Sequence, residues 1–342
     1  MNWSPFDPEV MTDPAKGHQY LLDECPVHHC DKFEPPFYTL SRYADVEYAL
    51  RDIETFSSHF GQGPRFTEPA GMLCDPPQHT QYRKLIQPAF TPKAVAALRP
   101  LVVPLANRLI DDILAGEPEF DLHDDLAFPL PVIIIAGMLG VPSEDLEDFK
   151  RWSDMQVALM GSENPLQYVD EQTRFQTYMH THMMRRRSQI ESGAEVPEDL
   201  LTLVVGAKTD AGEYIPDGDA LSMLNQLLVG GNETTTSLIT NMIWRLLEVP
   251  SRWQEILDDE SLIGAAVEES LRFDPPVLGL YRNATRDVDL HGEVIQKGSK
   301  VYINYAAANR DPRIFEKPDE FNLHRETKRH MAFGLGVHFC IG

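Results

Sequence analysis

The chain has 342 residues, with 53 Asp and Glu against 30 Lys and Arg, which gives a formal net charge of −23 at pH 7. This acidic balance argues against nucleic acid or an anionic membrane surface as the main partner. No apolar run reaches the roughly 18 residues needed to span a bilayer, and the start of the chain lacks the basic and apolar regions of a signal peptide. The sequence therefore predicts an acidic cytoplasmic protein.

The cysteines indicate a reducing compartment, because they are too few and too unevenly spaced for a disulfide framework. They are Cys25, Cys30, Cys74 and Cys340. Residues 25–30 contain the cysteine and histidine residues typical of a metal site, but their spacing does not match the usual zinc patterns. No repeat, low-complexity segment or Gly/Ser linker marks a boundary, so a single domain over 1–342 is expected.

The predicted elements are mostly helical. Near the start, proline-rich coil leads into a strand at 37–40 and a helix around 45–51. Apolar residues then recur with helical periodicity through the middle of the chain. The helices predicted from this periodicity cover 94–114, 131–139, 146–160, 174–190, 220–247 and 262–273. Pro250 is expected to stop the long helix at 220–247.

The last quarter of the chain changes character. Residues 288–290, 294–295 and 300–305 alternate or run apolar around Gly292 and Gly298. This pattern is typical of short strands joined by turns. A mainly α fold with a small β portion (α+β) is expected.

Two charged pairs are spaced to share one helix face. His79 and Arg83 stand at i, i+4, so both side chains can reach one anion. Glu269 and Arg272 stand at i, i+3, which permits an ion pair. Taken alone, the first pair fits a solvated helix face, and most pairs of the second kind are surface pairs contributing under about 1 kcal/mol.

Two adjacent glycines, Gly230 and Gly231, interrupt the apolar run of the 220–247 helix. Each costs roughly 1 kcal/mol relative to Ala in a helix interior, so something should compensate. A kinked or widened turn against a bulky ligand would do so, and Glu233 with Thr234 would place an acid and an alcohol there. The alternative is a plain kink with a solvated Glu233.

The final segment places Cys340 behind two glycines, Gly334 and Gly336. These glycines would let the backbone turn sharply and pass close to a flat ligand, while local N–H groups keep a thiolate ionised. This pattern is typical of a metal-ligating cysteine. The alternatives are a dinucleotide-binding loop, which lacks its leading strand, following helix and downstream acid here, and a buried structural cysteine.

Together and in this order, the four motifs resemble the cytochrome P450 family, whose cysteine-ligated haem activates oxygen. The resemblance extends over 75–342 and more weakly over 37–58. It implies the P450 fold of a bacterial, soluble, ferredoxin-dependent member, with a long central helix over haem b (iron protoporphyrin IX). In the family a further helix follows the cysteine. The sequence is therefore interpreted as truncated just after Cys340, and such a chain is expected to bind haem poorly.

The resemblance also implies roles for individual residues. Cys340 resembles the axial thiolate ligand of the iron, whose electron donation favours O–O cleavage. Thr234 and Glu233 resemble the alcohol and acid that deliver protons. The expected cofactor-binding residues are His79, Arg83, Gly230, Arg282, Phe333, His338, Cys340 and Gly342. Four of these, His79, Arg83, Arg282 and His338, are expected to contact the haem propionates.

A structural cluster and a substrate pocket follow from the same resemblance. Glu269 and Arg272, together with Arg325, are expected to hold the proximal side together. The expected pocket residues are Gln226, Val229, Val277 and Leu278, with a lid formed by the stretch before Leu73 and by residues 155–168. A glutamine is unusual in such a pocket, so the hypothesis is that Gln226 bonds the polar end of an otherwise apolar substrate.

The function expected from this resemblance is insertion of one oxygen atom from O2 into a small apolar molecule. Electrons would come from NAD(P)H through a ferredoxin reductase and a ferredoxin. Six basic residues would dock the acidic donor or serve as counterions for nearby acids: Arg83, Lys84, Lys93, Arg325, Lys328 and Arg329. The alternatives are a peroxide-using haem hydroxylase and a non-catalytic haem-binding protein.

Overall fold

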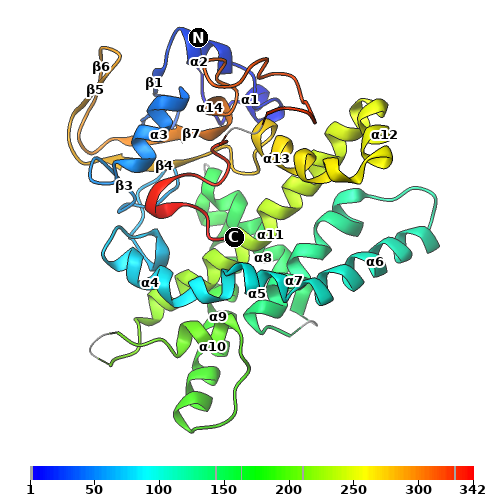
Figure 1. Ribbon diagram of the computed structural model, residues 1–342. Helices are drawn as coiled ribbons and strands as arrows, with labels where there is room; N and C mark the ends of the chain where they lie inside the picture. Colours follow the sequence, from blue (N-terminus) through cyan, green and yellow to red (C-terminus); the bar gives the residue numbers. More distant parts are fainter. Residues whose placement is uncertain (1–2, 143–144, 163, 210–211, 327–328) are drawn as a thin grey trace. The chain divides into compact units, whose positions relative to one another are not determined.

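The computed structural model describes residues 3–142, 145–162, 164–209, 212–326 and 329–342. Glu163 of the expected lid and Lys328 of the expected basic cluster lie outside these described residues. The chain forms two compact units (Figure 1). Unit 1 comprises Met1–Pro69 and Ser237–Cys340, and unit 2 comprises Ala70–Thr236 and Ile341–Gly342. The single-domain interpretation stays a prediction, and each unit is described by itself.

Unit 1 is built on a five-stranded sheet. Its strand order is β1 (Val27–Cys30), β2 (Phe37–Leu40), β7 (Lys300–Asn304), β4 (Gly279–Ala284) and β3 (Phe56–Ser57). β2 and β7 run parallel, whereas the other neighbours are antiparallel. Every residue of β7 is buried, as expected for a central strand covered on both faces. The hairpin of β5 (Val288–Leu290) and β6 (Glu293–Ile295) is separate and turns at Gly292, where φ is +84°.

Helices complete unit 1. They are α1 (Pro8–Thr12), α2 (His18–Asp23), α3 (Tyr43–Arg51), the last part of α11 (Asp217–Glu248), α12 (Pro250–Asp258), α13 (Ile263–Phe273) and α14 (Tyr305–Ala308). α3 and α14 contact the sheet through β7 and β4 (Figure 1). Pro250 is the first residue of α12, where its missing N–H costs nothing, and one residue, Val249, separates it from the end of the preceding helix.

Unit 2 is helical. Its helices are α4 (Gln78–Ile86), α5 (Pro92–Ala96), α6 (Arg99–Ala115), α7 (Pro129–Leu139), α8 (Leu146–Gly161), α9 (Val169–Glu191) and α10 (Leu200–Val205), together with the first part of α11 (Asp217–Glu248). α4, α7, α8, α9 and α10 share one apolar core with α11 (Figure 1). Short turns of 3-10 or π type lie in this unit at Gly71–Leu73, Gln87–Phe90, His123–Ala127 and Pro165–Tyr168, and in unit 1 at Glu260–Leu262 and Gly336–His338. α11 is thus the element around which unit 2 packs.

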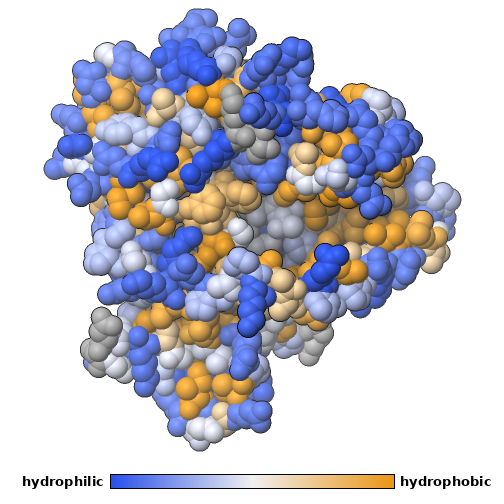
Figure 2. Space-filling view, in the orientation of Figure 1, coloured by the Kyte–Doolittle hydropathy of each residue, from blue (hydrophilic) through white to orange (hydrophobic). Residues whose placement is uncertain are grey.

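Apolar side chains also lie at the surface, most visibly along α6 (Figure 2). Leu114 is 77% exposed, and Leu101 and Ile110 are exposed as well. No single helix among the described residues has the length and apolar character to cross a membrane. Gln78–Ala96 and α6 pass that test only as a pair bent by 68°.

The expected mainly helical fold with a small β portion is confirmed. The strand predicted at 37–40 is β2, and α11 ends at Glu248, before the proline expected to stop it. α11 continues as one helix through the two glycines, and the kinked or widened turn expected there stays a prediction. A Cβ on Gly231 would lie 2.9 Å from Ile135, so close packing on α7 is what requires a glycine there.

Candidate functional site

Cys340 lies in a loop whose shape depends on two glycines. Gly334 and Gly336 have φ values of +65° and +73°, which few other residues adopt without strain. A Cβ on Gly336 would lie 2.7 Å from the carbonyl oxygen of Leu50. The backbone N–H of Cys340 donates to the carbonyl oxygen of Phe333 at 2.9 Å, and the cysteine is a free, exposed thiol. The loop therefore presents a sulfur atom that a metal can reach.

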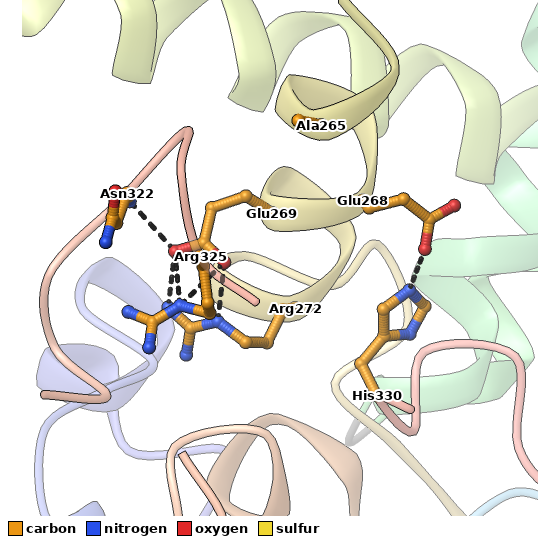
Figure 3. Close-up of a pocket in the computed structure, with 7 residues that line it drawn as sticks. All are labelled: Ala265, Glu268, Glu269, Arg272, Asn322, Arg325 and His330. Carbon is orange, nitrogen blue, oxygen red and sulfur yellow. Dashed lines mark hydrogen bonds and ion pairs between the residues drawn. The ribbon is translucent and has the colours of Figure 1, made fainter. Parts of the chain in front are cut away.

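Glu269, Arg272 and Arg325 form one buried cluster in unit 1 (Figure 3). Arg272 donates from Nε and Nη2 to the two carboxylate oxygens of Glu269, each at 2.8 Å. Arg325 Nε donates to the same carboxylate at 3.0 Å, and the backbone N–H of Asn322 donates to it at 2.9 Å. One carboxylate thus serves two guanidinium groups, and Arg325 is engaged here rather than in a surface patch.

This cluster is joined to the Cys340 loop by hydrogen bonds. Arg272 Nη1 donates to the carbonyl oxygen of Asn309 at 2.9 Å. The side-chain oxygen of Asn309 accepts from the backbone N–H of Met331 at 2.6 Å, and the carbonyl oxygen of Met331 accepts from Gly334 N–H at 2.8 Å. The segment that leads into the Cys340 loop is therefore braced by the buried ion pairs. No sequence pattern pointed to Asn309, because its partners are 37 and 22 residues away in the chain.

Arg282 on β4 is a buried cation, with a side chain that is 2% exposed. Its Nη1 donates to the carbonyl oxygen of Tyr281, and no carboxylate among the described residues lies within ion-pair distance. Burial, with a further contribution from Arg282, lowers the pKa of nearby Lys300 to about 8. Because buried charges are normally paired, Arg282 fits an anionic group of a bound molecule. An exposed thiol and a buried unpaired cation suit a cofactor that has both a metal and carboxylates.

The other expected cofactor residues of unit 1 lie around the loop. The ring centroids of Phe333 and Phe339 lie 6.2 Å apart, and His338 is the last residue of the turn Gly336–His338. Gly342, assigned to unit 2, is exposed.

In unit 2, α4 carries His79 and Arg83 one turn apart. His79 is buried and Arg83 is partly buried. Between them on the same helix, Tyr82 donates its hydroxyl proton to Asp219 of α11 at 2.7 Å. The sequence did not indicate this bond, which fixes α4 against α11.

The acid and alcohol of α11 have defined partners. The Thr234 hydroxyl donates to the carbonyl oxygen of Gly230 at 2.7 Å, one turn earlier. Glu233 accepts from Asn232 Nδ2 at 3.1 Å, and the same amide group donates to Ser153 Oγ of α8 at 3.2 Å. Asn232 is fully buried. The only sequence signal for Asn232 as a partner of Glu233 is that it is a polar amide residue within an apolar helical run.

Gln226 does not have the free side chain that the sequence hypothesis requires. Its Nε2 group donates to the carbonyl oxygen of Ala70 at 3.2 Å and to Ser222 Oγ at 2.6 Å. Its Oε1 accepts from the backbone N–H of Met72 at 3.2 Å. Both N–H groups are therefore used within the protein, which leaves no donor for a substrate. The physical reason is that the backbone N–H of Met72 and the carbonyl oxygen of Ala70 lie within hydrogen-bond distance of this face of α11.

The other expected pocket residues are apolar and lie in different places. Val229 is partly buried on α11 in unit 2. In unit 1, Val277 packs against the core of the sheet. Leu278 lines a cavity of about 340 Å³ together with Trp244 and Phe273. In the part of the chain that the structure describes, no three His, Cys, Asp or Glu side chains gather as a metal site, and 27–30 is strand β1.

Comparison with known proteins identifies relatives along nearly the whole chain. The family model described as "Cytochrome P450" matches residues 33–342. Cytochrome P450 107B1 of Saccharopolyspora erythraea is 35% identical, over 89% of this chain and 76% of that protein. Nocardicin C N-oxygenase of Nocardia uniformis is also 35% identical, over 99% of this chain and 85% of that protein.

Solved structures agree with these sequence matches. CYP109E1 from Bacillus megaterium in complex with testosterone has a TM-score of 0.87 and 31% identity, and the match covers 98% of this chain and 86% of that one. Cytochrome P450 CREJ in complex with (4-ethylphenyl) dihydrogen phosphate has a TM-score of 0.89 and 31% identity, covering 99% of this chain and 87% of that one.

Proposed function

Because the chain belongs to the cytochrome P450 family of haem-dependent monooxygenases, we propose that it inserts one oxygen atom from O2 into a small apolar molecule. The observation that carries the proposal is the Cys340 loop, which presents an exposed thiol on a backbone shaped by two left-handed glycines. When bound, the haem supplies the iron centre at which O2 is reduced and activated.

Cys340 Sγ would ligate the iron as a thiolate, and the carboxylates of the haem would take up the unpaired charge of Arg282. Within unit 2, His79 and Arg83 on α4 are proposed as carboxylate-binding residues. Phe333, His338, Gly230 and Gly342 are proposed to line the cofactor. Cys340 and Arg282 both belong to unit 1, and its buried ion pairs brace the segment before the loop.

Proton delivery would use α11. The Thr234 hydroxyl proton points to the carbonyl oxygen of Gly230, so this bond must open before Oγ1 can donate elsewhere. Glu233, held by the Asn232 amide, would resupply the proton to Thr234 Oγ1. Oxygen chemistry that starts from O2 needs these protons. The acid and alcohol therefore favour this reaction over one that starts from peroxide.

Electrons would come from NAD(P)H through a ferredoxin reductase and an acidic ferredoxin-type donor in the cytoplasm. Supporting this, Lys84, Lys93 and Arg329 are exposed on an otherwise acidic chain. Arg325 is not available for docking, because its guanidinium is taken by Glu269. Exposed positive charges on an acidic protein steer acidic partners and speed their association.

The substrate would be small and largely apolar. Val229, Val277 and Leu278 offer apolar contacts, and Gln226 adds no free donor to them. Relatives named as a nocardicin C N-oxygenase and a cyclomarin C epoxidase differ in the atom that is oxidised, so the family relationship alone sets no particular position of attack.

The test compares Thr234→Ala with Thr235→Ala in haem-loaded protein supplied with NADPH, ferredoxin reductase and ferredoxin. Thr235 is the exposed neighbour on the same helix and is the matched control. Thr234→Ala is expected to release more hydrogen peroxide per NADPH and less oxidised product, whereas Thr235→Ala should resemble the wild type. Equal coupling in all three proteins would contradict the proposed proton route.

A further inference from the structure

Three polar side chains of α11 face a single turn of the backbone. They are Asp219, Ser222 and Gln226, at i, i+3 and i+7, and we call them the polar stripe. This spacing places them on one helix face. The turn is 70–72, and it precedes α4 in unit 2.

The polar stripe satisfies the backbone of this turn. The N–H of Gly71 donates to Asp219 Oδ1 at 2.7 Å, and the N–H of Met72 donates to Gln226 Oε1 at 3.2 Å. The carbonyl oxygen of Ala70 accepts from Ser222 Oγ and from Gln226 Nε2, both at 3.2 Å. Two backbone N–H groups are thus bonded by side chains, and the carbonyl oxygen of Ala70, which also accepts from Leu73 N–H at 3.3 Å, gains two further donors.

The turn also lies very close to the helix. Gly71 has a φ of +59°, and a Cβ there would lie 3.0 Å from Met223 Cγ and 3.1 Å from Gln226 Nε2. A larger residue would push the turn off α11. The close approach and the hydrogen bonds therefore depend on one another.

The second oxygen of Asp219 bonds a different element. Oδ2 accepts from the hydroxyl of Tyr82 on α4 at 2.7 Å, and Gln78 Nε2 donates to the same hydroxyl at 3.1 Å. Burial, with a further contribution from Asp219, raises the pKa of Tyr82 to about 12. The hydroxyl therefore stays protonated and keeps donating. Asp219 is the point where the turn and α4 are both attached to α11.

We propose that Asp219 and Gln226 are positioning residues that hold the 70–72 turn on α11, and that Asp219 also holds α4, which presents His79 and Arg83 to the haem. The part that concerns haem and substrate rests on the proposed function. Gln226 then influences substrate choice through the place of the turn, without bonding the substrate.

The two attachments can be separated by mutation. Gln226→Leu removes bonds to the turn and leaves Tyr82 in place, whereas Tyr82→Phe removes the bond to α4 and leaves the turn. Asp219→Leu removes both, and Asp219→Asn keeps an oxygen for Gly71. Gln172→Leu is the matched control, because Gln172 is a partly buried glutamine of α9 that bonds a side chain, Gln156, and no turn.

The first measurement is hydrogen exchange of the Gly71 and Met72 amides in the haem-free chain, which needs no activity. Both amides should be protected in the wild type and in Gln172→Leu. In Gln226→Leu the Met72 amide, which loses its acceptor, should exchange roughly tenfold faster, the loss expected for one hydrogen bond, whereas Gly71 keeps its bond to Asp219. Exchange of the Met72 amide that is equally fast in the wild type and Gln226→Leu would overturn the proposal.

The second measurement is the rate at which haem passes to an acceptor protein. Tyr82→Phe should lose haem several-fold faster while Gly71 and Met72 stay protected, and Gln226→Leu should show the reverse. If Asp219→Leu does not fold, Gln226→Leu and Tyr82→Phe, which each remove only one attachment, still decide the outcome. Protected amides in a protein that binds haem but oxidises nothing would sink the proposed function and leave the polar stripe intact. Haem loss unaffected by Tyr82→Phe would overturn the role of Asp219 in placing α4.

Discussion

The backbone N–H of Cys340 donates a hydrogen bond to the carbonyl oxygen of Phe333, 2.9 Å away. This bond closes the loop across Gly334 and Gly336, so the cysteine is positioned by its own loop. Thiolate ligands need such fixed placement, because a metal site tolerates little variation in distance and angle.

The first prediction concerns Gly336 in this loop. Gly336→Ala should destabilise the protein by at least ~2 kcal/mol, because a left-handed backbone is strained for alanine and the new Cβ would meet Leu50. Gly334→Ala is the control: it has a similar φ, but the nearest atom to its Cβ would be 3.6 Å away. Urea unfolding should show a larger loss for Gly336→Ala, and equal losses would argue against the Leu50 contact.

The second prediction concerns the buried carboxylate of Glu269. Glu269→Gln should cost about 3–5 kcal/mol, since it leaves Arg272 and Arg325 buried without an anion. Haem retention should fall too, because the cluster braces the segment before the Cys340 loop. Glu47→Gln, in an exposed pair with Arg51, should change the free energy of unfolding little. Similar unfolding curves for both variants would contradict the bracing role.

The third prediction separates the two glycines of α11. Gly231→Ala should destabilise by about 1–3 kcal/mol, because its Cβ would lie 2.9 Å from Ile135. Gly230→Ala meets nothing within 4 Å and should stabilise the haem-free chain by about 0.5–1 kcal/mol through helix propensity. Denaturant midpoints of the two variants test this. A stabilising Gly231→Ala would show that α7 does not pack closely there.

The fourth prediction concerns pH. Burial, with Arg310 nearby, lowers the pKa of His18 to about 3. Below its usual pKa of about 6.5 the unfolded chain takes up a proton that folded His18 does not, so the free energy of unfolding falls as pH falls towards 3. Stability from this group is complete above about pH 6.5.

His18→Phe removes this titration and serves as the comparison. Between about pH 7.5 and about pH 5.5 the wild type should lose about 1.4 kcal/mol more than the variant in urea unfolding. Parallel losses in the two proteins would mean that folded His18 accepts a proton readily.

Local patterns in the sequence predicted much of the fold. The long apolar periodicity of residues 220–247 corresponds to α11, and the apolar run 37–40 is β2. Three strands were missed: β1, β3 and β4. β3 has only two residues, too few to show a period. β1 contains two histidines and a cysteine, which are residue types that often ligate metals, and β4 has Arg282 and Asn283 buried among its residues. Polar residues inside a buried strand hide its period, because tertiary partners and not hydropathy allow their burial.

The candidate site was predictable where its signal is local. The glycines before Cys340 and the spacing of Glu269 and Arg272 are visible in the sequence, and the structure pairs the latter two. The partners of Gln226 and Asn309 were not visible. Gln226 bonds a turn 154 and 156 residues away, and no period or spacing encodes such a contact.

The haem roles of individual residues depend above all on Cys340, which a spectrum tests directly. With haem supplied, the reduced, CO-bound wild type should show the red-shifted Soret band of a thiolate-ligated haem. Cys340→Ser should lose this band, whereas Cys25→Ser, at another partly exposed cysteine, should keep it. An imidazole-like spectrum in the wild type, or a red-shifted band that survives in Cys340→Ser, would contradict the assignment of Cys340 as the ligand.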